Sequence, residues 1–277
     1  NDTCNIDAGK NQGYWITVRS AQTQAAGKYT GKVSVTFDGG EREIPVSVEV
    51  WDFPLPVKSS MQTNFLHHWN NNYYEDVGIS SKEMNRMVWE FFLDYRISGN
   101  YMFFIEYDGY GADLENYVKS MKEFVDEHPE ITHVQLLLHQ WDYSGTVDSE
   151  AMANNKNNKY MYELLKKYDL TQIASYYVVD EPADTEANEK LIKDLAAGIS
   201  GFAPDIKNIV TTNNSKYDGY ISCWCPLWNM IDKSFVAGKQ ALGEHVWWYG
   251  CAVPAAPYPT YHLNDNLLSP RIVHWMQ

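Results

Sequence analysis

The sequence has little positive charge and no long apolar run. Lys and Arg total 22 against 36 Asp and Glu, which gives a formal net charge of −14. Nucleic-acid binders need a basic surface that displaces counterions from phosphates, and anionic membrane surfaces also repel an acidic protein. No stretch approaches the ~20 apolar residues of a transmembrane helix, and no signal peptide is recognisable. We therefore expect a soluble protein with a neutral partner, no nucleic-acid binding and no membrane insertion.

Cysteine is scarce, and the usual metal and nucleotide motifs are missing. The four cysteines are Cys4, Cys223, Cys225 and Cys251, and none has zinc-site spacing with histidines. There is also no Gly-rich phosphate loop. Cys223 and Cys225 are spaced C-x-C, so in a strand both side chains would point to the same face. We expect buried free thiols, with a disulfide involving Cys251 as the alternative.

Aromatic residues, by contrast, are abundant. They make up 14% of the chain, with 10 Trp and 20 Tyr, and the apolar fraction of 44% is enough for a sizeable core. Some of these rings will be core. Others can line a pocket, because a sugar ring presents apolar C–H faces to aromatic rings while its hydroxyls need polar partners.

The first part of the chain predicts β structure. Residues 29–37 and 44–51 alternate apolar and polar side chains, the period of a half-buried strand, and residues 14–18 are strand-like as well. Asp38-Gly39-Gly40 is a hairpin signal, and Pro54-Leu55-Pro56 reads as a stiff linker. We expect residues 1–56 to be the C-terminal part of a β-sandwich domain plus this linker.

From about residue 60, strand-like runs alternate with helix-like stretches. The expected strands are 63–68, 101–106, 133–139, 173–179, 209–212, 221–225 and 245–249. The expected helices are 80–95, 112–128, 155–168, 184–201, 229–241 and 265–277. In the clearest helix, 184–201, Asp184 could be the N-cap and Gly201 the stop.

This repeating pattern predicts an α/β fold. Repeated β-then-α units imply a parallel sheet, and seven strands in one series favour a (β/α)8 TIM-like barrel over an open sheet. An eighth strand is not recognisable. The barrel, assigned to residues 57–277, is therefore either incomplete in this chain or contains a strand that the pattern does not reveal.

Two adjacent carboxylates follow the fourth of these strands. Residues 173–179 form a near-continuous apolar run, typical of a parallel strand buried on both faces, and Asp180-Glu181-Pro182 ends it. Barrel enzymes carry their active sites at this C-terminal rim. A pair of carboxylates suits glycosidic bond cleavage: one group protonates the leaving oxygen, and the other stabilises positive charge at the sugar or activates a nucleophile.

The adjacency of the two acids is a complication. Successive side chains on a strand point to opposite faces, so the pair can serve one substrate only if the backbone bends there. The strand end and Pro182 favour such a bend. The plainer alternative is that Asp180 and Glu181 are solvated residues at a strand-to-helix junction.

Several motifs in a fixed order resemble a known family. They are 27–31 and 50–56 near the start, Asp180-Glu181-Pro182 at a strand end, Trp224-Cys225-Pro226 at another, and 247–251, 257–263 and 269–275 towards the end. Together they resemble glycoside hydrolase family 123, over roughly residues 14–277. The chain departs from that family by lacking most of the N-terminal sandwich and the last barrel strand.

The resemblance implies an N-acetyl-β-galactosaminidase. Members of the family use the 2-acetamido oxygen of the substrate as the nucleophile, and the glycosidic configuration is retained. At the matching positions, Asp180 would orient and polarise the acetamido N–H, while Glu181 would protonate the leaving oxygen and later activate water. The resemblance further implies no metal, no cofactor, an oligosaccharide or glycoconjugate substrate, and a secreted or periplasmic location.

Aromatic residues near strand ends are candidates for substrate binding. Trp224, Trp248 and Tyr249 could stack on a sugar ring, or they could be large core residues that cap the barrel. Tyr258 and Tyr261 lie in a Pro-rich loop after the seventh strand, where barrel loops build active sites. Tyr261 could hold the acetamido oxygen, or it could pack under the loop.

Polar residues at strand ends are further candidates. Asn213 and Asn214 could bind sugar hydroxyls, or they could be turn residues. His67 or its neighbour could face a hydroxyl. His68, His139 and His245 are considered as members of a metal site. Glu106 and Asp142 are considered as partners of the carboxylate pair or as catalytic acids in its place. The histidine spacings match no known metal motif.

Two other functions stay open. The first is a hydrolase of another glycan that uses the Asp-Glu pair differently and cleaves substrates without an acetamido group. The second is a non-catalytic carbohydrate-binding or scaffold module. The observation that separates them is whether the two carboxyl groups face a concave, aromatic-lined pocket. The oligomeric state is unknown from the sequence.

Overall fold

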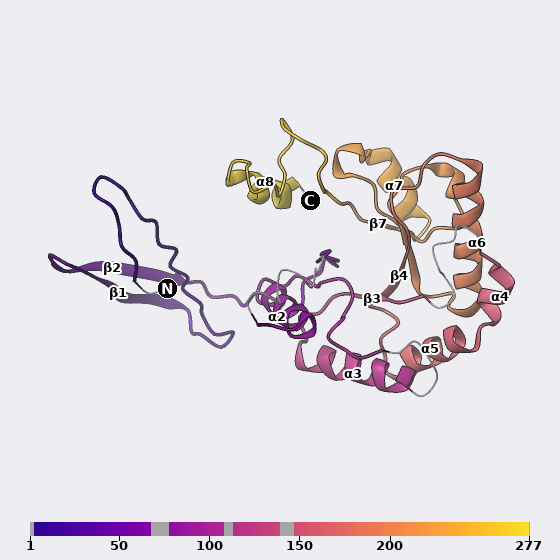
Figure 1. Ribbon diagram of the computed structural model, residues 1–277, viewed down its shortest axis with the longest axis horizontal. Helices are drawn as coiled ribbons and strands as arrows, with labels where there is room; N and C mark the ends of the chain where they lie inside the picture. Colours follow the sequence, from indigo (N-terminus) through magenta and orange to yellow (C-terminus); the bar gives the residue numbers. More distant parts are fainter. Residues whose placement is uncertain (1–2, 68–77, 108–112, 139–146, 277) are drawn as a thin grey trace. The chain divides into compact units, whose positions relative to one another are not determined.

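The structure is a computed structural model that describes residues 3–67, 78–107, 113–138 and 147–276. By their contacts these residues form two compact units, Asn1–Val57 and Lys58–Gln277. Figure 1 shows the elements of both units along the chain.

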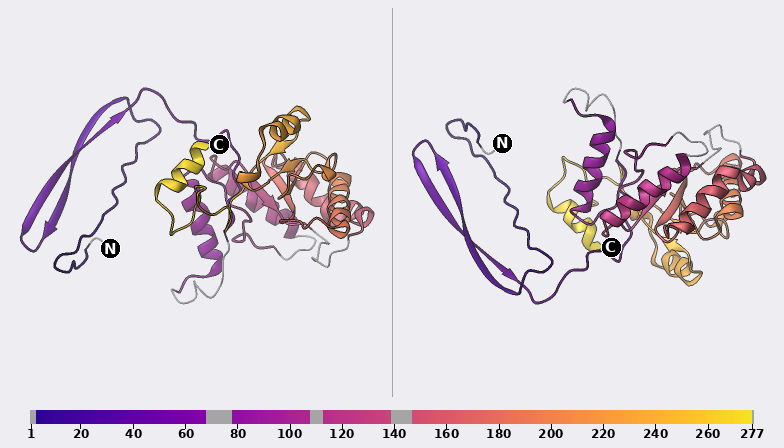
Figure 2. Two further views of the ribbon diagram at one scale, coloured as in Figure 1. Left: turned by 90° about the horizontal axis from the view of Figure 1, so that it is seen from above. Right: turned by 90° about the horizontal axis from the view of Figure 1, so that it is seen from below.

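The first unit contains an antiparallel hairpin. β1 (Gly27–Phe37) pairs with β2 (Gly40–Val50), which confirms the strands expected at 29–37 and 44–51 and the turn at Asp38-Gly39-Gly40. Figure 2 shows the pair as a long twisted ribbon. The strand expected at 14–18 is wrong, because this segment has no partner strand and Trp15 is 93% exposed. A two-stranded ribbon is at most marginally stable by itself, so the hairpin alone does not make a sandwich.

The second unit contains seven α-helices in its described part. Six match the predicted ones, and a short helix at Ser149–Asn154, capped by Asp148, was not predicted. They are α2 (Ser81–Leu93), α3 (Asp113–Glu127), α4 (Ser149–Asn154), α5 (Lys156–Lys167), α6 (Glu186–Phe202), α7 (Lys233–Ala241) and α8 (Leu268–Met276).

Both ends of α6 differ from the expectation. Its N-cap is Thr185, whose hydroxyl accepts the Asn188 N–H, and not Asp184, which pairs with Lys216. Gly201 does not stop the helix, which continues to Phe202. A Cβ at Gly201 would come within 2.6 Å of the Ala153 Cβ, so glycine is needed here for the close approach of α4.

A five-stranded parallel sheet forms the centre of this unit. Its order is β3-β4-β5-β6-β7, so neighbours in sequence are neighbours in the sheet. The strands are β3 (Val134–Leu136), β4 (Ala174–Val179), β5 (Lys207–Val210), β6 (Cys223–Trp224) and β7 (His245–Val246). Helices α3, α4, α5 and α6 lie on its outer side (Figure 1). The α/β class with a parallel sheet is therefore confirmed.

The strand expected at 101–106 is wrong. This apolar run forms a turn, with the Ile105 N–H bonded to the Met102 carbonyl. Met102 and Phe104 of this run are nevertheless buried, and Phe104 packs edge-on against Trp89 of α2 and Phe124 of α3. A short apolar run indicates burial more reliably than it indicates a strand.

The sheet is strongly curled. His133, next to β3, and Trp247, next to β7, have ring centroids only 5.0 Å apart. In a flat sheet, strands four positions apart would be about 19 Å apart, at ~4.8 Å per strand. The two edges of the sheet therefore bend towards each other around a concave inner face.

Extended segments continue this curve beyond β3. Phe65 forms an isolated parallel bridge with Gly99, and the Asn64 amide donates to Gln135 Oε1 beside β3. Only Phe65 of the expected strand 63–68 is bridged, and His68 lies outside the described residues. On the far side, Tyr261, which follows β7, packs against Phe65 with centroids 6.0 Å apart. A complete eight-stranded barrel is not present among the described residues.

Side chains alternate between the two faces of the sheet. Outward-facing Tyr176 packs on Phe202 of α6, and outward-facing Trp224 packs on Phe235 of α7. On the inner face, Ile209, Cys223 and Cys225 form a cluster with Tyr177, Trp247 and Tyr249. This confirms that Cys223 and Cys225 share one face. All four cysteines are free, with Cys223 and Cys225 buried and Cys4 and Cys251 exposed.

Buried His133 predicts a dependence of stability on pH. Its side chain is fully buried, its Nε2 lies 2.6 Å from Ser175 Oγ, and burial lowers its pKa to about 3. Between pH 6.5 and 3 the unfolded chain binds a proton at His133 that the folded chain does not bind. The unfolding free energy therefore decreases as the pH is lowered through this range. From pH 7 to 5 the wild type should lose roughly 2 kcal/mol more unfolding free energy than His133→Gln, measured by urea unfolding. Equal losses would contradict this assignment.

Candidate active site

Asp180 and Glu181 lie where β4 ends, and the backbone bends at this point. The pairing with β5 shifts register between Tyr177 and Val179, and Glu181 has a φ of 38°, in the left-handed region. Such a backbone costs about 1–3 kcal/mol for a residue with a side chain and is found most often at functional sites. The bend removes the objection that adjacent strand residues point to opposite faces.

Thr211, just after β5, holds this bend. Its side chain is buried, and its hydroxyl accepts the Glu181 backbone N–H. The hydroxyl oxygen also lies 3.3 Å from Asp180 Oδ1 and 3.4 Å from the Val179 carbonyl, so its own proton has an acceptor. One side chain thus contacts both residues of the carboxylate pair.

Asp180 has a second partner on its own strand. The Tyr177 hydroxyl donates to Asp180 Oδ1 at 2.6 Å. Burial and then this hydrogen bond raise the pKa of Tyr177, so the phenol keeps its proton and remains a donor. Both hydrogen bonds to Asp180 from the described residues reach Oδ1, which leaves Oδ2 for a ligand.

Glu181 is bound from the opposite edge of the sheet. The Tyr249 hydroxyl donates to Glu181 Oε1 at 2.6 Å, and Cys251 Sγ lies 3.9 Å from the same oxygen. Burial first, and then the hydrogen bond to Glu181, raises the pKa of Tyr249. The charge of Asp180 also contributes to that increase, so both carboxylates act on one phenol and converge on the same place.

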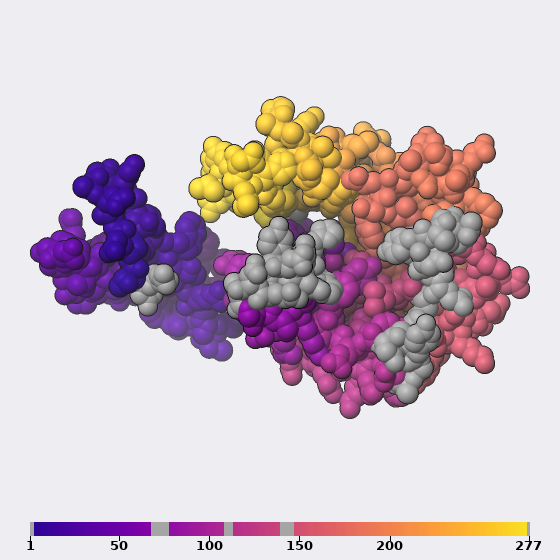
Figure 3. Space-filling view, in the orientation of Figure 1, coloured from indigo at the N-terminus to yellow at the C-terminus, as the bar shows by residue number. Residues whose placement is uncertain are grey.

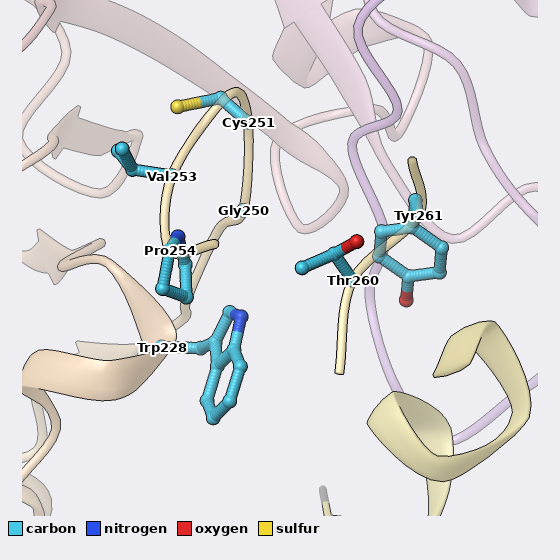
Figure 4. Close-up of a pocket in the computed structure, with 7 residues that line it drawn as sticks. All are labelled: Trp228, Gly250, Cys251, Val253, Pro254, Thr260 and Tyr261. Atoms are coloured by element: carbon cyan, nitrogen blue, oxygen red, sulfur yellow. The ribbon is translucent and has the colours of Figure 1, made fainter. Parts of the chain in front are cut away.

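An aromatic-lined concavity lies between the loop after β7 and the residues around Thr260. Its free space is about 10 Å³, room for roughly one water molecule. Figure 4 shows Trp228, Pro254 and Thr260 pointing into a common space. Its lining residues are Trp228, Gly250, Cys251, Val253, Pro254, Thr260 and Tyr261. Cys251 belongs both to this lining and to the surroundings of Glu181. In Figure 3 the chain after β7 (yellow) forms a continuous surface beside α7 (orange).

The predicted aromatic residues have different positions. Tyr249 contacts Glu181, and Tyr261 lines the concavity with its hydroxyl 3.4 Å from His274 Nε2. Trp224 is fully buried and donates to Glu244 Oε2, so it is a core residue and not a surface for a sugar ring. Trp248 is half-buried, and among the described residues it is Trp247 that joins the inner cluster.

The predicted polar residues mostly have structural partners. Asn213 donates to the Met230 carbonyl at 3.3 Å and so ties the end of β5 to the short turn Trp228–Met230. Asn214 caps the turn Ser215–Tyr217, as its alternative assignment anticipated. The His67 backbone N–H contacts Asn100 Oδ1 at 3.5 Å.

The remaining acids and histidines form no second site in the described residues. Glu106 is exposed and pairs with Lys82, and this contact lowers its pKa, whereas a general acid needs a raised one. His245 is largely exposed at β7, and the partial burial of its ring lowers its pKa. His68, His139 and Asp142 lie outside the described residues. Among the residues that are described, no group of three or more His, Cys, Asp or Glu could hold a metal ion, and no helix is long and apolar enough to span a membrane.

Three residues of the site were not predicted from the sequence. Trp228 lies in a short turn after β6, and Tyr177 and Thr211 lie on strand runs that read as core. Strand register could have found one of them. Val179 pairs with Val210, so Thr211 follows β5 at the level of Asp180. Tyr177, three residues before Asp180, would point to the opposite face of a regular strand and reaches Asp180 only because the backbone bends.

Comparison with known proteins gives no assignment. No family model matches the chain, and a search of curated proteins finds no match either. The likeness to glycoside hydrolase family 123 therefore stays a prediction, and function has to be argued from the geometry of the site.

The role of Thr211 predicts a difference between two substitutions. Thr211→Val keeps the shape of the side chain but leaves the Glu181 N–H without its acceptor, which should cost about 1–3 kcal/mol of unfolding free energy. Exchange of the Glu181 amide proton should then be at least about tenfold faster. Thr211→Ser keeps the hydroxyl and should stay close to the wild type in both measurements. Equal effects of Val and Ser would show that the hydroxyl does not hold the bend.

Proposed function

We propose that the second unit is the catalytic domain of a glycoside hydrolase on a (β/α)8-type barrel. Its substrate is a terminal β-linked N-acetylhexosamine of the GalNAc type on an oligosaccharide or glycoconjugate, cleaved with retention and assisted by the 2-acetamido group. One observation carries the proposal: two adjacent carboxylates at the end of β4 are bound separately, Asp180 by Tyr177 of the same strand and Glu181 by Tyr249 after the far edge strand β7 of a curled parallel sheet.

Asp180 serves the acetamido group. Tyr177 and Thr211 fix its Oδ1, so Oδ2 can accept the acetamido N–H. The carboxylate then orients the carbonyl oxygen towards the anomeric carbon and stabilises the positive charge that develops as the two bond. Fixed charges of this kind act most strongly where charge appears in the transition state.

Glu181 serves the leaving group. In the first step the acetamido oxygen bonds to the anomeric carbon, the glycosidic bond breaks, and the Glu181 carboxyl gives its proton to the departing oxygen. In the second step water attacks the anomeric carbon, the ring formed by the acetamido group opens, and the Glu181 carboxylate takes the proton of water. Each step inverts the anomeric carbon, so the overall outcome is retention.

The aromatic walls and the curled sheet support this proposal over a bare strand-to-helix junction. Sugar-binding sites need apolar faces with a few placed polar groups, and Tyr177 and Tyr249 place aromatic rings directly at the carboxylates. The GalNAc preference, the absence of a cofactor and a secreted or periplasmic location rest on the family likeness alone.

A series of N-acyl substrates tests the acetamido mechanism. Replacing the acetyl methyl group by mono-, di- and trifluoromethyl withdraws electrons from the carbonyl oxygen and weakens it as a nucleophile. We expect kcat/KM to fall stepwise, by at least about tenfold across the series, or about 1.4 kcal/mol. A flat series would mean that the acetamido oxygen does not attack. The enzyme would then be a glycosidase that uses the Asp-Glu pair differently.

A binding module without catalysis is the remaining alternative. It predicts that the protein binds N-acetylgalactosamine saturably and cleaves neither acetamido nor plain glycosides. The exposed carboxyl groups and their tyrosine partners would then hold sugar hydroxyls only.

A further inference from the structure

Tyr249 is fixed in place through its backbone. Its N–H donates to the Pro226 carbonyl at 3.1 Å, and its own carbonyl accepts the Trp228 N–H at 3.0 Å. The same residue forms a parallel bridge with Leu227. Its ring packs against the cluster on the inner face of the sheet. A side chain held both by hydrogen-bonded backbone and by packing keeps its polar group in one position.

The hydroxyl of this tyrosine is a dedicated donor to Glu181. Among the residues that the structure describes, its acceptor is Glu181 Oε1, at 2.6 Å. Burial and then this hydrogen bond raise the pKa of Tyr249, so the phenol keeps its proton and stays a donor. Cys251 Sγ lies 3.9 Å from the same oxygen. Within the described part of the chain, both contacts of the Glu181 carboxyl group therefore reach Oε1, and Oε2 has no hydrogen-bond partner.

This asymmetry determines where an acidic proton can be carried. A neutral carboxyl group has its proton on one oxygen, and the other oxygen is the better hydrogen-bond acceptor. A phenol that donates to Oε1 therefore favours the form with the proton on Oε2. When that proton leaves, the hydrogen bond from Tyr249 becomes charge-assisted and stronger. Tyr249 thus stabilises the state formed during proton transfer more than the state before it.

We propose that Tyr249 is a positioning residue for the acid, and that the proton donated by Glu181 is carried on Oε2. This inference rests on the proposed function, in which Glu181 protonates the departing oxygen. In the first step the Oε2–H bond breaks and the proton goes to the leaving oxygen as the glycosidic bond breaks, while Oε1 keeps its hydrogen bond to Tyr249. In the second step the proton of the attacking water returns to Oε2.

The test compares two substrates with the same donor sugar. One has a neutral pyranose as the leaving group, which needs a proton to depart, and the other has fluoride, which does not. Tyr249→Phe should lower kcat/KM about tenfold for the disaccharide and change kcat/KM for the fluoride by less than about twofold. Tyr95→Phe, a substitution of a 58% exposed tyrosine after α2, is the matched control and should leave both values unchanged. Equal losses with the two substrates in Tyr249→Phe, or no loss with either, would overturn the assignment.

A double variant shows whether Tyr249 acts through Glu181. In the Glu181→Gln background there is no acidic proton to position, so adding Tyr249→Phe should change kcat/KM for the disaccharide by less than about twofold. A further loss of about tenfold would mean that Tyr249 acts independently of Glu181, and the inference would be wrong. Circular dichroism of each variant establishes that it is folded.

An unfolding measurement separates failure of this inference from failure of the proposed function. Urea unfolding of Tyr249→Phe, Glu181→Ala and the double variant forms a cycle that requires no activity. The hydrogen bond predicts a coupling of at least about threefold in the unfolding equilibrium constant. Additive effects would overturn the inference even in an active enzyme. Coupling in a folded protein that cleaves neither substrate would contradict the proposed function, and with it proton transfer from Glu181, while the contact itself would stand.

Discussion

Glu181→Gln is expected to reduce kcat about 10²–10⁴-fold on substrates with a poor leaving group, such as a sugar, because proton donation typically contributes that much. The amide is nearly isosteric and can still accept the Tyr249 hydroxyl, so the bend at Glu181 should survive. With a leaving group that needs no proton, such as fluoride or dinitrophenolate, the loss should be far smaller. Steady-state kinetics across a series of leaving groups measures the difference.

The matched control for this variant is Glu186→Gln. Glu186 is an exposed carboxylate in the first turn of α6, five residues further along the chain. Its variant should behave like the wild type with every leaving group. If Glu181→Gln loses activity equally with sugar and fluoride leaving groups, Glu181 does not act as the acid.

Asp180→Asn should lower kcat about 10²–10³-fold, and by a similar factor whatever the leaving group. The reason is that, in the proposed mechanism, Asp180 stabilises charge on the acetamido group and takes no part in protonating the departing oxygen. The asparagine oxygen can still accept from Tyr177 and Thr211, so the packing of the site should be retained. In the leaving-group series, the loss of kcat in Glu181→Gln should depend on the leaving group, whereas the loss in Asp180→Asn should not.

Asp184→Asn is the control for Asp180→Asn. Asp184 is an exposed aspartate four residues after Asp180, and it pairs with Lys216. Loss of that surface ion pair should cost stability of ~0–1 kcal/mol at most and leave kcat unchanged. A loss in Asp180→Asn that grows as the leaving group becomes poorer would assign the acid role to Asp180 instead.

Much of the secondary structure follows from local sequence patterns. The period of apolar residues located six of the seven helices in the described part of the second unit, and the turn at Asp38-Gly39-Gly40 located the hairpin. The short helix α4 was missed because six residues carry too little periodicity. What shows its position is the close approach of Ala153 to Gly201, a tertiary contact.

Two strand predictions were wrong because an apolar or alternating segment does not always pair with another strand. Residues 101–106 are as apolar as a strand, but they fill the space between α2 and α3 as a turn. Residues 14–18 alternate like a strand but have no partner in the first unit. Hydrophobicity records burial, whereas a strand also requires a neighbour with which to pair.

The sequence was enough to predict the two charged residues of the candidate site, but not their conformation or their neighbours. Asp180 and Glu181 could be found because carboxylates end a buried apolar run. Their conformation could not, because the left-handed φ of Glu181 conflicts with the local preference of a residue before proline and is held by Thr211 from another strand. Trp228 was missed for a similar reason, since only the folded chain brings it to the loop after β7, where the Tyr249 carbonyl accepts its N–H.

The most direct test is the hydrolysis of an aryl β-N-acetylgalactosaminide beside the matching β-galactoside, with the wild type and Glu181→Gln. The proposed mechanism predicts cleavage of the acetamido substrate alone by the wild type, and a severe loss in the variant. Cleavage of both substrates at similar rates would contradict assistance by the acetamido group. Cleavage of neither by the folded protein would contradict the assignment of Asp180 and Glu181 as a catalytic pair for this class of substrate.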